Sequence, residues 1–182
     1  VKNISKAFAP ATVANVGPGF DVLSFSLEGV GDTISLQVCE EGITIEEVTG
    51  FSKGISLDIK KNVIGPVIEK MIEKSGYQKG LRIRLEKGIP LGSGIGSSSA
   101  SSAVAAIAFN DLLGNPFSKQ ELVEFAKYGE ELACGNAHLD NVAPAIFGGV
   151  CLVLMNDQEI YQVPMNSPFY CCAVRPELTV MT

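Results

Sequence analysis

The sequence has few of the features that identify nucleic-acid or membrane proteins. Lysine and arginine number 14 against 20 aspartates and glutamates, which gives a net charge of −6, and there is no basic cluster. A nucleic-acid-binding domain would need such a cluster. No stretch approaches the roughly 18 apolar residues of a membrane span. The N-terminal residues alternate as in a strand, so we expect no signal peptide, no membrane and no nucleic-acid partner.

Histidine and metal-binding cysteine patterns are also scarce. The only histidine is His138, and the five cysteines lack the spacing of a metal site. An odd number of cysteines favours reduced thiols, and with them a cytoplasmic protein.

Hydrophobic residues make up 46% of the chain and charged residues 19%. This balance leaves enough apolar material for a globular core.

Glycine and serine, in contrast, are concentrated in residues 90–102. Glycine occupies every second position at Gly92, Gly94 and Gly96, and a serine-rich segment follows. Residues 81–85 alternate like a strand, and residues 103–109 form an apolar helical run. A strand, a glycine loop and a helix in this order bring free backbone N–H groups together with the positive end of a helix dipole. We therefore expect a phosphate to bind here.

Other interpretations of this stretch fit less well. A Walker A loop requires a lysine, and none lies between Lys87 and Lys119. The dinucleotide fingerprint Gly-x-Gly-x-x-Gly has a different glycine spacing. A flexible Gly/Ser linker stays open on composition alone. Against a linker stand the embedded Leu91 and Ile95, and the helix that follows without a break.

Two further loops carry polar residues. Gly17-Pro18-Gly19 enforces a tight reversal, and Asn15 and Asp21 flank it. Their side chains either point into one cavity or bond their own backbone, as Asx residues do in turns. His138, Asp140 and Asn141 cluster later in the chain, and form either a capped turn or a site. The residues alone leave these alternatives open.

Hydrophobic periodicity predicts strands alternating with helices. Strands are expected at residues 1–9, ending at Pro10, and at 22–27, 33–39, 43–48, 81–85, 150–155, 160–163 and 170–174. Helices are expected from Asn62 to about Ser75, from about Ser98 to Leu113, and from Ser118 to about Cys134. Ser118 and Glu121 form a capping box at the start of the last of these helices.

Three motifs in order resemble the GHMP kinases, the family of galacto-, homoserine, mevalonate and phosphomevalonate kinases. Residues 90–101 are similar to the family's Pro-x-x-x-Gly-Leu-Gly-Ser-Ser-Ala-x-Ser loop, with Ile95 for leucine and Ser99 for alanine. Residues 10–21 resemble the Pro-x-Thr-x-Ala-Asn-x-Gly-x-Gly-Phe-Asp motif of homoserine kinases in particular. Residues 135–144 resemble their Gly-x-x-His-x-Asp-Asn-Val-Ala-Pro signature, with Leu139 in place of the usual alanine.

The resemblance implies a fold and an activity. The fold would be α+β: a GHMP kinase N-terminal domain, like domain 2 of ribosomal protein S5, with a mixed or antiparallel sheet packed against helices. Residues 1–182 would form this ATP-binding domain, with the junction to a missing C-terminal domain near 165–182. The activity would be phosphorylation of the L-homoserine side-chain hydroxyl by ATP with Mg²⁺, on the way to threonine. Another small-molecule GHMP kinase and a non-catalytic S5-like module are the alternatives. The partners would be L-homoserine and ATP, and a homodimer is also an option.

The resemblance also implies the metal ligands. Glu130 and Glu131 lie near the predicted end of a helix, where the dipole disfavours carboxylates. Either a bound cation or a solvated surface position would relieve this. In the family, the metal carboxylate lies eight residues before the motif histidine, and Glu130 lies at this distance from His138. Glu130 and the Ser98 hydroxyl would therefore hold Mg²⁺.

The substrate ligands follow from the same resemblance. Asn15, Asp21, His138 and Asp140 would bind homoserine, and Asn15 and Thr182 would act beside its hydroxyl without a general base. ATP would be bound by Asn62 at the adenine and, along the loop, by Pro90, Leu91, Gly92, Ser93, Gly94, Ile95, Gly96, Ser97, Ser98, Ser99, Ala100 and Ser101.

Overall fold

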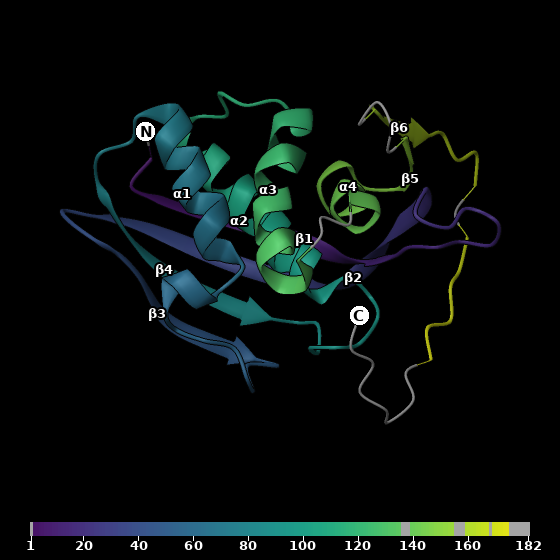
Figure 1. Ribbon diagram of the computed structural model, residues 1–182, viewed down its shortest axis with the longest axis horizontal. Coiled ribbons are helices and arrows are strands. Elements are labelled where there is room, and N and C mark those ends of the chain that lie inside the picture. Colours follow the sequence, from purple (N-terminus) through teal and green to yellow (C-terminus); the bar gives the residue numbers. More distant parts are fainter. Residues whose placement is uncertain (1, 136–138, 155–158, 168, 175–182) are drawn as a thin grey trace.

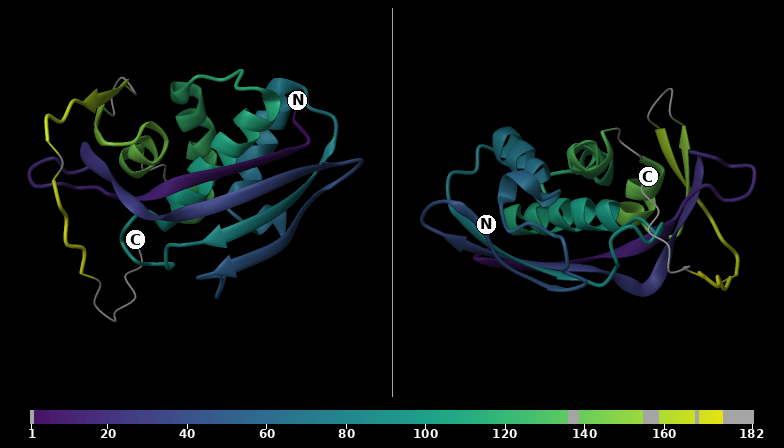
Figure 2. Two further views of the ribbon diagram at one scale, coloured as in Figure 1. Left: turned by 180° about the vertical axis from the view of Figure 1, so that it is seen from behind. Right: turned by 60° about the horizontal axis from the view of Figure 1, so that its bottom comes forward.

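The computed structural model describes residues 2–135, 139–154, 159–167 and 169–174 (Figure 1). The strands are β1 (Ile4–Val13), β2 (Leu23–Cys39), β3 (Ile43–Gly50), β4 (Gly80–Lys87), β5 (Val150–Leu154) and β6 (Glu159–Val163). The helices are the short 3-10 helix η1 (Ile59–Lys61) and α1 (Ile64–Ser75), α2 (Ser97–Leu113), α3 (Lys119–Cys134) and α4 (Leu139–Phe147). The α-helices cover one face of a single sheet (Figure 2).

The sheet is built around the long strand β2. The strand order is β3-β4-β2-β5-β6, and β1 also pairs with β2. β4 pairs with the C-terminal part of β2, and β5 pairs with its N-terminal residues 23–25. β3 and β4 are parallel, and the other pairs are antiparallel. This mixed sheet with helices on one face confirms the predicted α+β fold.

Helix α2 lies at the centre of the helical layer. It packs against β1, β2 and each of the other three α-helices. Most of its residues are buried, and many of them are alanines or serines whose small side chains let neighbouring elements approach closely. A helix that is buried on all sides belongs to the core. Its N-terminus is therefore fixed relative to the sheet.

Among the described residues, no helix has both the length and the apolar character to cross a membrane.

Several predicted elements are confirmed. In β4, Leu81, Ile83 and Leu85 are buried while Arg82 and Arg84 are exposed, as the alternation predicted. Helix α1 ends at Gly76, whose φ of 70° is left-handed. Helix α3 begins with the capping box: the Ser118 hydroxyl accepts the Glu121 backbone N–H, and the Glu121 carboxylate accepts the Ser118 N–H.

The first two strands differ from the prediction. β1 continues through Pro10 to Val13, and the two predicted strands at 22–27 and 33–39 are one strand, β2. The β1–β2 ladder passes from the pair Pro10–Gly31 directly to the pair Thr12–Ser26. The missing N–H of Pro10 therefore lies beside an irregularity in the ladder, where proline is tolerated. Gly29 and Gly31 lie inside β2 and do not end the strand.

The C-terminal part shows two more differences. Residues 139–147, where a capped turn or a site was expected, form α4 with Pro144 inside it. The predicted strand at 170–174 is wrong, because these residues have no regular secondary structure, and Tyr170 and Val174 are 98% and 84% exposed. Apolar alternation makes a strand only where a neighbouring strand accepts its backbone hydrogen bonds. Met155 and residues 175–182 lie outside the described residues.

Candidate functional site

Residues 88–96, here called the glycine loop, join β4 to α2. Gly92, Gly94 and Gly96 have φ values of 62°, 75° and 68°, a region that side-chain-bearing residues rarely adopt. Gly96 is the N-cap of α2, and no side chain caps this end of the helix. The first N–H groups of α2 and the positive end of its dipole are therefore free of an internal acceptor side chain. This is the geometry of an anion site.

A buried ion pair lies directly behind the loop. Lys87 and Asp32 are almost completely inaccessible, and Lys87 Nζ donates to Asp32 Oδ2. The same ammonium donates to the Ser97 carbonyl at 2.9 Å and to the Ser101 hydroxyl at 2.7 Å. Ser101 in turn donates to Asp32 at 2.7 Å. Burial lowers the pKa of Lys87, and the Asp32 carboxylate opposes this shift.

The sequence interpretation did not assign this ion pair, although β4 contains a signal for it. Leu81, Ile83 and Leu85 point into the core, and Lys87 continues the same alternation by two residues. The charged residue therefore occupies an inward position. A buried lysine needs a charged or hydrogen-bonding partner. Asp32 carries the same signal in β2, because it occupies the inward position two residues before the buried Ile34.

Glu130 lies against the start of α2. Its side chain is buried, with 2% of the residue exposed, and its Oε2 accepts a hydrogen bond from Ser99 Oγ at 2.9 Å. The neighbouring Glu131 is exposed. The alternative of a solvated surface position is therefore wrong for Glu130. The hydroxyl that contacts this carboxylate belongs to Ser99, whereas Ser98 was the predicted partner, and Ser98 is half-buried in the same turn.

The oxygens of Glu130 and Ser99 would suit a Mg²⁺ ion that also binds substrate phosphates and water. They would not be enough to hold a metal ion by themselves. Among the described residues, no three His, Cys, Asp or Glu side chains gather to hold a metal ion. Mg²⁺ prefers oxygen ligands, and usually binds through one or two carboxylates, substrate phosphates and several waters. A buried carboxylate next to a serine hydroxyl and the uncapped N-terminus of α2 fits that requirement.

The loop around residues 15–21 is closed by the side chain of Asn15. Asn15 Oδ1 accepts the backbone N–H of Asp21 at 2.8 Å, and both residues have positive φ, 58° and 56°. The interpretation as a backbone-bonding turn residue therefore holds for Asn15. This hydrogen bond uses only the carbonyl oxygen of the Asn15 amide. Asp21 is half-buried at the end of the loop.

The three sequence motifs meet at one point. Thr12 Oγ1 at the end of β1 donates to Asn141 Oδ1 at the start of α4, at 2.9 Å. The Thr12 N–H also donates to the Ile95 carbonyl of the glycine loop. A Cβ on Gly96 would lie 2.1 Å from Thr12 Oγ1 and 3.1 Å from Asn141 Oδ1. Thr12 and Asn141 belong to the motifs but were not among the predicted site residues.

Other predicted residues have internal roles. The Asn62 amide is buried, donates to the Ser56 carbonyl at 2.8 Å and accepts the Ile64 N–H. Asp140 is buried, and its Oδ1 accepts the Asn141 N–H. The Ser97 hydroxyl donates to the Ile89 carbonyl at 3.1 Å. His138 and Thr182 lie outside the described residues.

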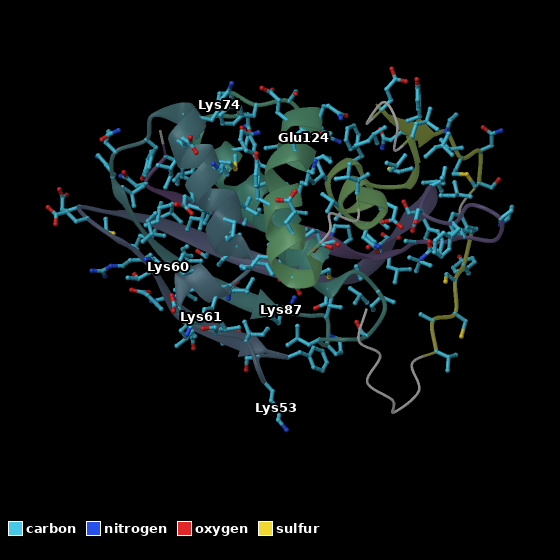
Figure 3. All side chains as sticks on the ribbon, in the orientation of Figure 1. Lys53, Lys60, Lys61, Lys74, Lys87 and Glu124 are labelled. Atoms are coloured by element: carbon cyan, nitrogen blue, oxygen red, sulfur yellow. The ribbon has the colours of Figure 1, made fainter. Side chains whose placement is uncertain are left out.

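The side chains of the labelled lysines differ in direction (Figure 3). Lys87 lies near the centre of the molecule, below the end of α3, whereas Lys53 extends away from the fold. Lys60 and Lys61 are exposed on η1, and Lys61 forms an ion pair with Asp58. Lys87 is therefore the labelled lysine that the fold encloses.

Comparisons with known proteins agree with this geometry. Homoserine kinase from Chlorobium phaeobacteroides (strain BS1) is 40% identical over 187 residues, covering 96% of this chain and 58% of the relative. Homoserine kinase from Methanococcus maripaludis (strain S2) is 41% identical over 88% of this chain and 54% of the relative. The chain thus spans just over half the length of these relatives.

A solved structure and a family model extend the comparison. The crystal structure of homoserine kinase from Cytophaga hutchinsonii superposes with a TM-score of 0.85 at 43% identity, covering 90% of this chain and 53% of that one. The family model for the GHMP kinases N terminal domain matches residues 47–149. This match contains β4, the glycine loop and helices α1 to α4. The chain therefore belongs to the GHMP kinase family, as its N-terminal domain.

Proposed function

We propose that the protein containing this chain transfers the γ-phosphoryl group of ATP to the side-chain hydroxyl of L-homoserine, forming O-phospho-L-homoserine on the route to threonine. The convergence of Thr12, Gly96 and Asn141 carries the proposal, because it joins the substrate-type motifs to the phosphate-type loop. The relatives named homoserine kinase, at about 40% identity, support this choice of substrate.

The glycine loop is the proposed site of the ATP phosphates. Phosphoryl transfer depends mainly on positioning and on neutralising the triphosphate charge. The positive φ values at Gly92, Gly94 and Gly96 turn the backbone so that it can approach a phosphate closely. The uncapped N-terminus of α2 adds N–H donors and a positive dipole end. The Ser97 hydroxyl binds an internal partner, so Ser97 would contribute its backbone N–H group instead. Ser101 lies one turn into α2, where its N–H bonds within the helix and its hydroxyl donates to Asp32, so Ser101 would support the loop from behind.

Glu130 and the serines at the start of α2 would hold Mg²⁺. The Ser99 hydroxyl already contacts the Glu130 carboxylate, and Ser98, the partner implied by the family, lies in the same turn. When bound there, Mg²⁺ would neutralise charge on the β- and γ-phosphates. The buried Glu130 carboxylate would fix its position.

Homoserine would lie between the first and third motifs. Asp21 suits its ammonium group, because opposite charges attract and because the carboxylate is only partly exposed. Asn15, His138, Asp140 and Thr182 complete the proposed set around its hydroxyl and carboxylate. No general base is assigned: the site would orient the hydroxyl for direct attack on the γ-phosphorus. The bond from that phosphorus to the β-phosphate oxygen would break, ADP would leave, and the hydroxyl proton would pass to an oxygen of the transferred phosphoryl group.

A reducing, cytoplasmic setting belongs to the same proposal. In the part of the chain that the structure describes, no disulfide joins the five cysteines, which is usual where glutathione keeps thiols reduced; they are Cys39, Cys134, Cys151, Cys171 and Cys172.

Substrate comparison tests the proposed function. The full-length protein that contains this chain is assayed for ADP formation with L-homoserine, mevalonate or galactose as the acceptor. We expect turnover with homoserine to exceed turnover with the other two by at least about 100-fold. Phosphorus NMR would then identify the product as the phosphate ester of the side-chain hydroxyl. Equal or faster turnover of mevalonate or galactose would overturn the homoserine assignment.

A further inference from the structure

We propose that Lys87 and Asp32 are positioning residues that hold the glycine loop in the shape that binds nucleotide. The inference rests on the proposed function, because it concerns the loop to which the ATP phosphates are assigned. It adds a requirement that the glycine motif does not contain: a buried ion pair on two strands would set the geometry of the loop between them and α2.

The two ends of the glycine loop are joined at this pair. Lys87 immediately precedes the loop and Ser97 immediately follows it, and Lys87 Nζ donates to the Ser97 carbonyl at 2.9 Å. Asp32 Oδ1 accepts the N–H of Gly88, the first loop residue, at 3.1 Å. The hydrogen bond from Ser97 Oγ to the Ile89 carbonyl crosses the same base. The loop is thus closed by side chains at both ends, while Gly94 at its tip has open space around it.

The hydrogen-bonding capacity of Lys87 is fully used. A lysine ammonium has three N–H donors. Asp32 Oδ2, the Ser97 carbonyl and the Ser101 hydroxyl accept one each. A phosphate could accept from Lys87 only if one of these hydrogen bonds broke. The Asp32 carboxylate also neutralises the charge of the ammonium, so the pair exerts little net attraction on a phosphate. Both features favour positioning over direct contact.

The packing around the pair also favours a positioning role. Ser101 lies one turn after Ser97 on α2, and it connects Lys87 to Asp32 by accepting from one and donating to the other. The pair therefore holds β2, β4 and the first turns of α2 in one arrangement. A loop whose two ends are fixed loses less conformational entropy when it orders around a ligand. Loss of the pair is therefore expected to weaken nucleotide binding more than binding of the second substrate.

A charge-free double variant tests the inference. Removing one partner alone would leave an uncompensated buried charge, which strongly destabilises a protein. The full-length protein carrying both Lys87→Met and Asp32→Asn keeps the side-chain volumes and loses both charges. We expect the dissociation constant for ADP, measured by calorimetry, to rise about tenfold. The KM for homoserine should stay within about twofold, because its proposed ligands lie outside the glycine loop.

A control separates loop positioning from general stability. Asp111 near the C-terminal end of α2 accepts hydrogen bonds from Lys2 and Ser5, away from the glycine loop. Asp111→Asn should lower the melting temperature and leave the ADP affinity unchanged. A purely structural role for Lys87 and Asp32 predicts the same result for the double variant: a lower melting temperature with the parent's ADP affinity.

Ser101→Ala provides a second variant in case the double variant does not fold. It removes the hydroxyl between Lys87 and Asp32 but keeps the ion pair, and we expect the same direction of change in ADP affinity. In the folded variants, a loss of ADP affinity of about fivefold or more supports the inference, and a smaller loss overturns it. Absence of ADP binding by the parent protein would instead overturn the proposed function.

Discussion

Ser99 on α2 and Glu130 on α3 are brought into contact by the glycine next to Glu130. A Cβ on Gly129 would lie 2.2 Å from Ser102 Oγ and 2.6 Å from the Val63 carbonyl, so only glycine allows α3 to approach α2 this closely. At that separation the Ser99 hydroxyl reaches Glu130 Oε2 at 2.9 Å. The packing of α3 against α2 thus positions the carboxylate of Glu130, the proposed metal ligand. The neighbouring Glu131 is exposed and is not held by this packing.

This placement predicts different effects for the two neighbouring glutamates. Glu130→Gln removes a buried carboxylate beside the glycine loop, so turnover should fall by at least about tenfold and should need more Mg²⁺. Glu131→Gln changes an exposed residue and should leave turnover close to the parent value. Steady-state rates over a Mg²⁺ titration give the comparison. Similar losses in both variants would contradict the assignment of Glu130.

A second prediction compares two glycines that both have positive φ and open space at the Cβ position. Gly94 and Gly114 both have positive φ, 75° and 88°, and a Cβ on either would meet nothing within 4 Å. Valine at each position should therefore cause similar backbone strain, of about 1–2 kcal/mol. Only Gly94→Val should also lose nucleotide binding, because its side chain would occupy the proposed phosphate space. Calorimetry with ADP on both variants tests this, and retention of affinity within about threefold by Gly94→Val would refute the phosphate assignment.

Much of the fold was predictable because local patterns determine it. The alternation of β4, the capping box of α3 and the glycine at the end of α1 each act within a few residues, and each was confirmed. The wrong strand at 170–174 and the continuous β2 depend instead on whether a partner strand is present. Sequence periodicity carries no information about that partner.

The candidate site was predictable to a similar extent. The glycine loop and the preference for Glu130 came from motif spacing and family resemblance. The contacts that join the motifs were not predictable, because Thr12 and Asn141 are 129 residues apart in sequence. Asp32 lies 55 residues before Lys87 in sequence, and their contact depends on the register of β2 beside β4, which pairs Thr33 with Glu86.

The Asp21 assignment predicts a substrate-specific defect. Asp21 has a φ of 56°, a conformation that asparagine adopts readily, so Asp21→Asn should fold normally. Loss of the carboxylate should raise the KM for homoserine by about tenfold or more, with little effect on the KM for ATP. Initial rates with each substrate varied in turn provide the measurement. A larger change in the KM for ATP would place Asp21 in the nucleotide site instead.

Cysteine reactivity tests the packing beside α4. Burial raises the pKa of the Cys151 thiol to about 11. Because the thiolate is the reactive form, Cys151 should resist iodoacetamide at neutral pH until the protein unfolds. Cys171 and Cys172 are exposed and should react in the native state. Mass spectrometry of the labelled peptides distinguishes these sites, and equal native labelling of Cys151 would show that β5 does not pack as described.

The last prediction concerns the arginines. A substrate carboxylate in a pocket favours a bidentate guanidinium. Arg82 and Arg84 on β4 both form ion pairs with Glu46 on β3, with N–O distances of 3.6 and 3.1 Å. All three residues are exposed. The alternation of β4 turns them away from the buried side chains that face the helices. In the part of the chain that the structure describes, neither arginine is therefore placed to bind homoserine.

The 182-residue polypeptide on its own should therefore fold and bind nucleotide weakly, but turn over homoserine slowly. Its core and glycine loop are formed by the described residues, whereas no described arginine is available for the carboxylate of homoserine. We expect its homoserine-dependent ATP consumption to be at least about tenfold below that of the full-length protein. A coupled assay of both proteins decides the matter. Circular dichroism must first show that the isolated polypeptide is folded. Comparable turnover by a folded 182-residue polypeptide would mean that its own residues bind the carboxylate, and Arg175→Ala would then be the next variant to measure.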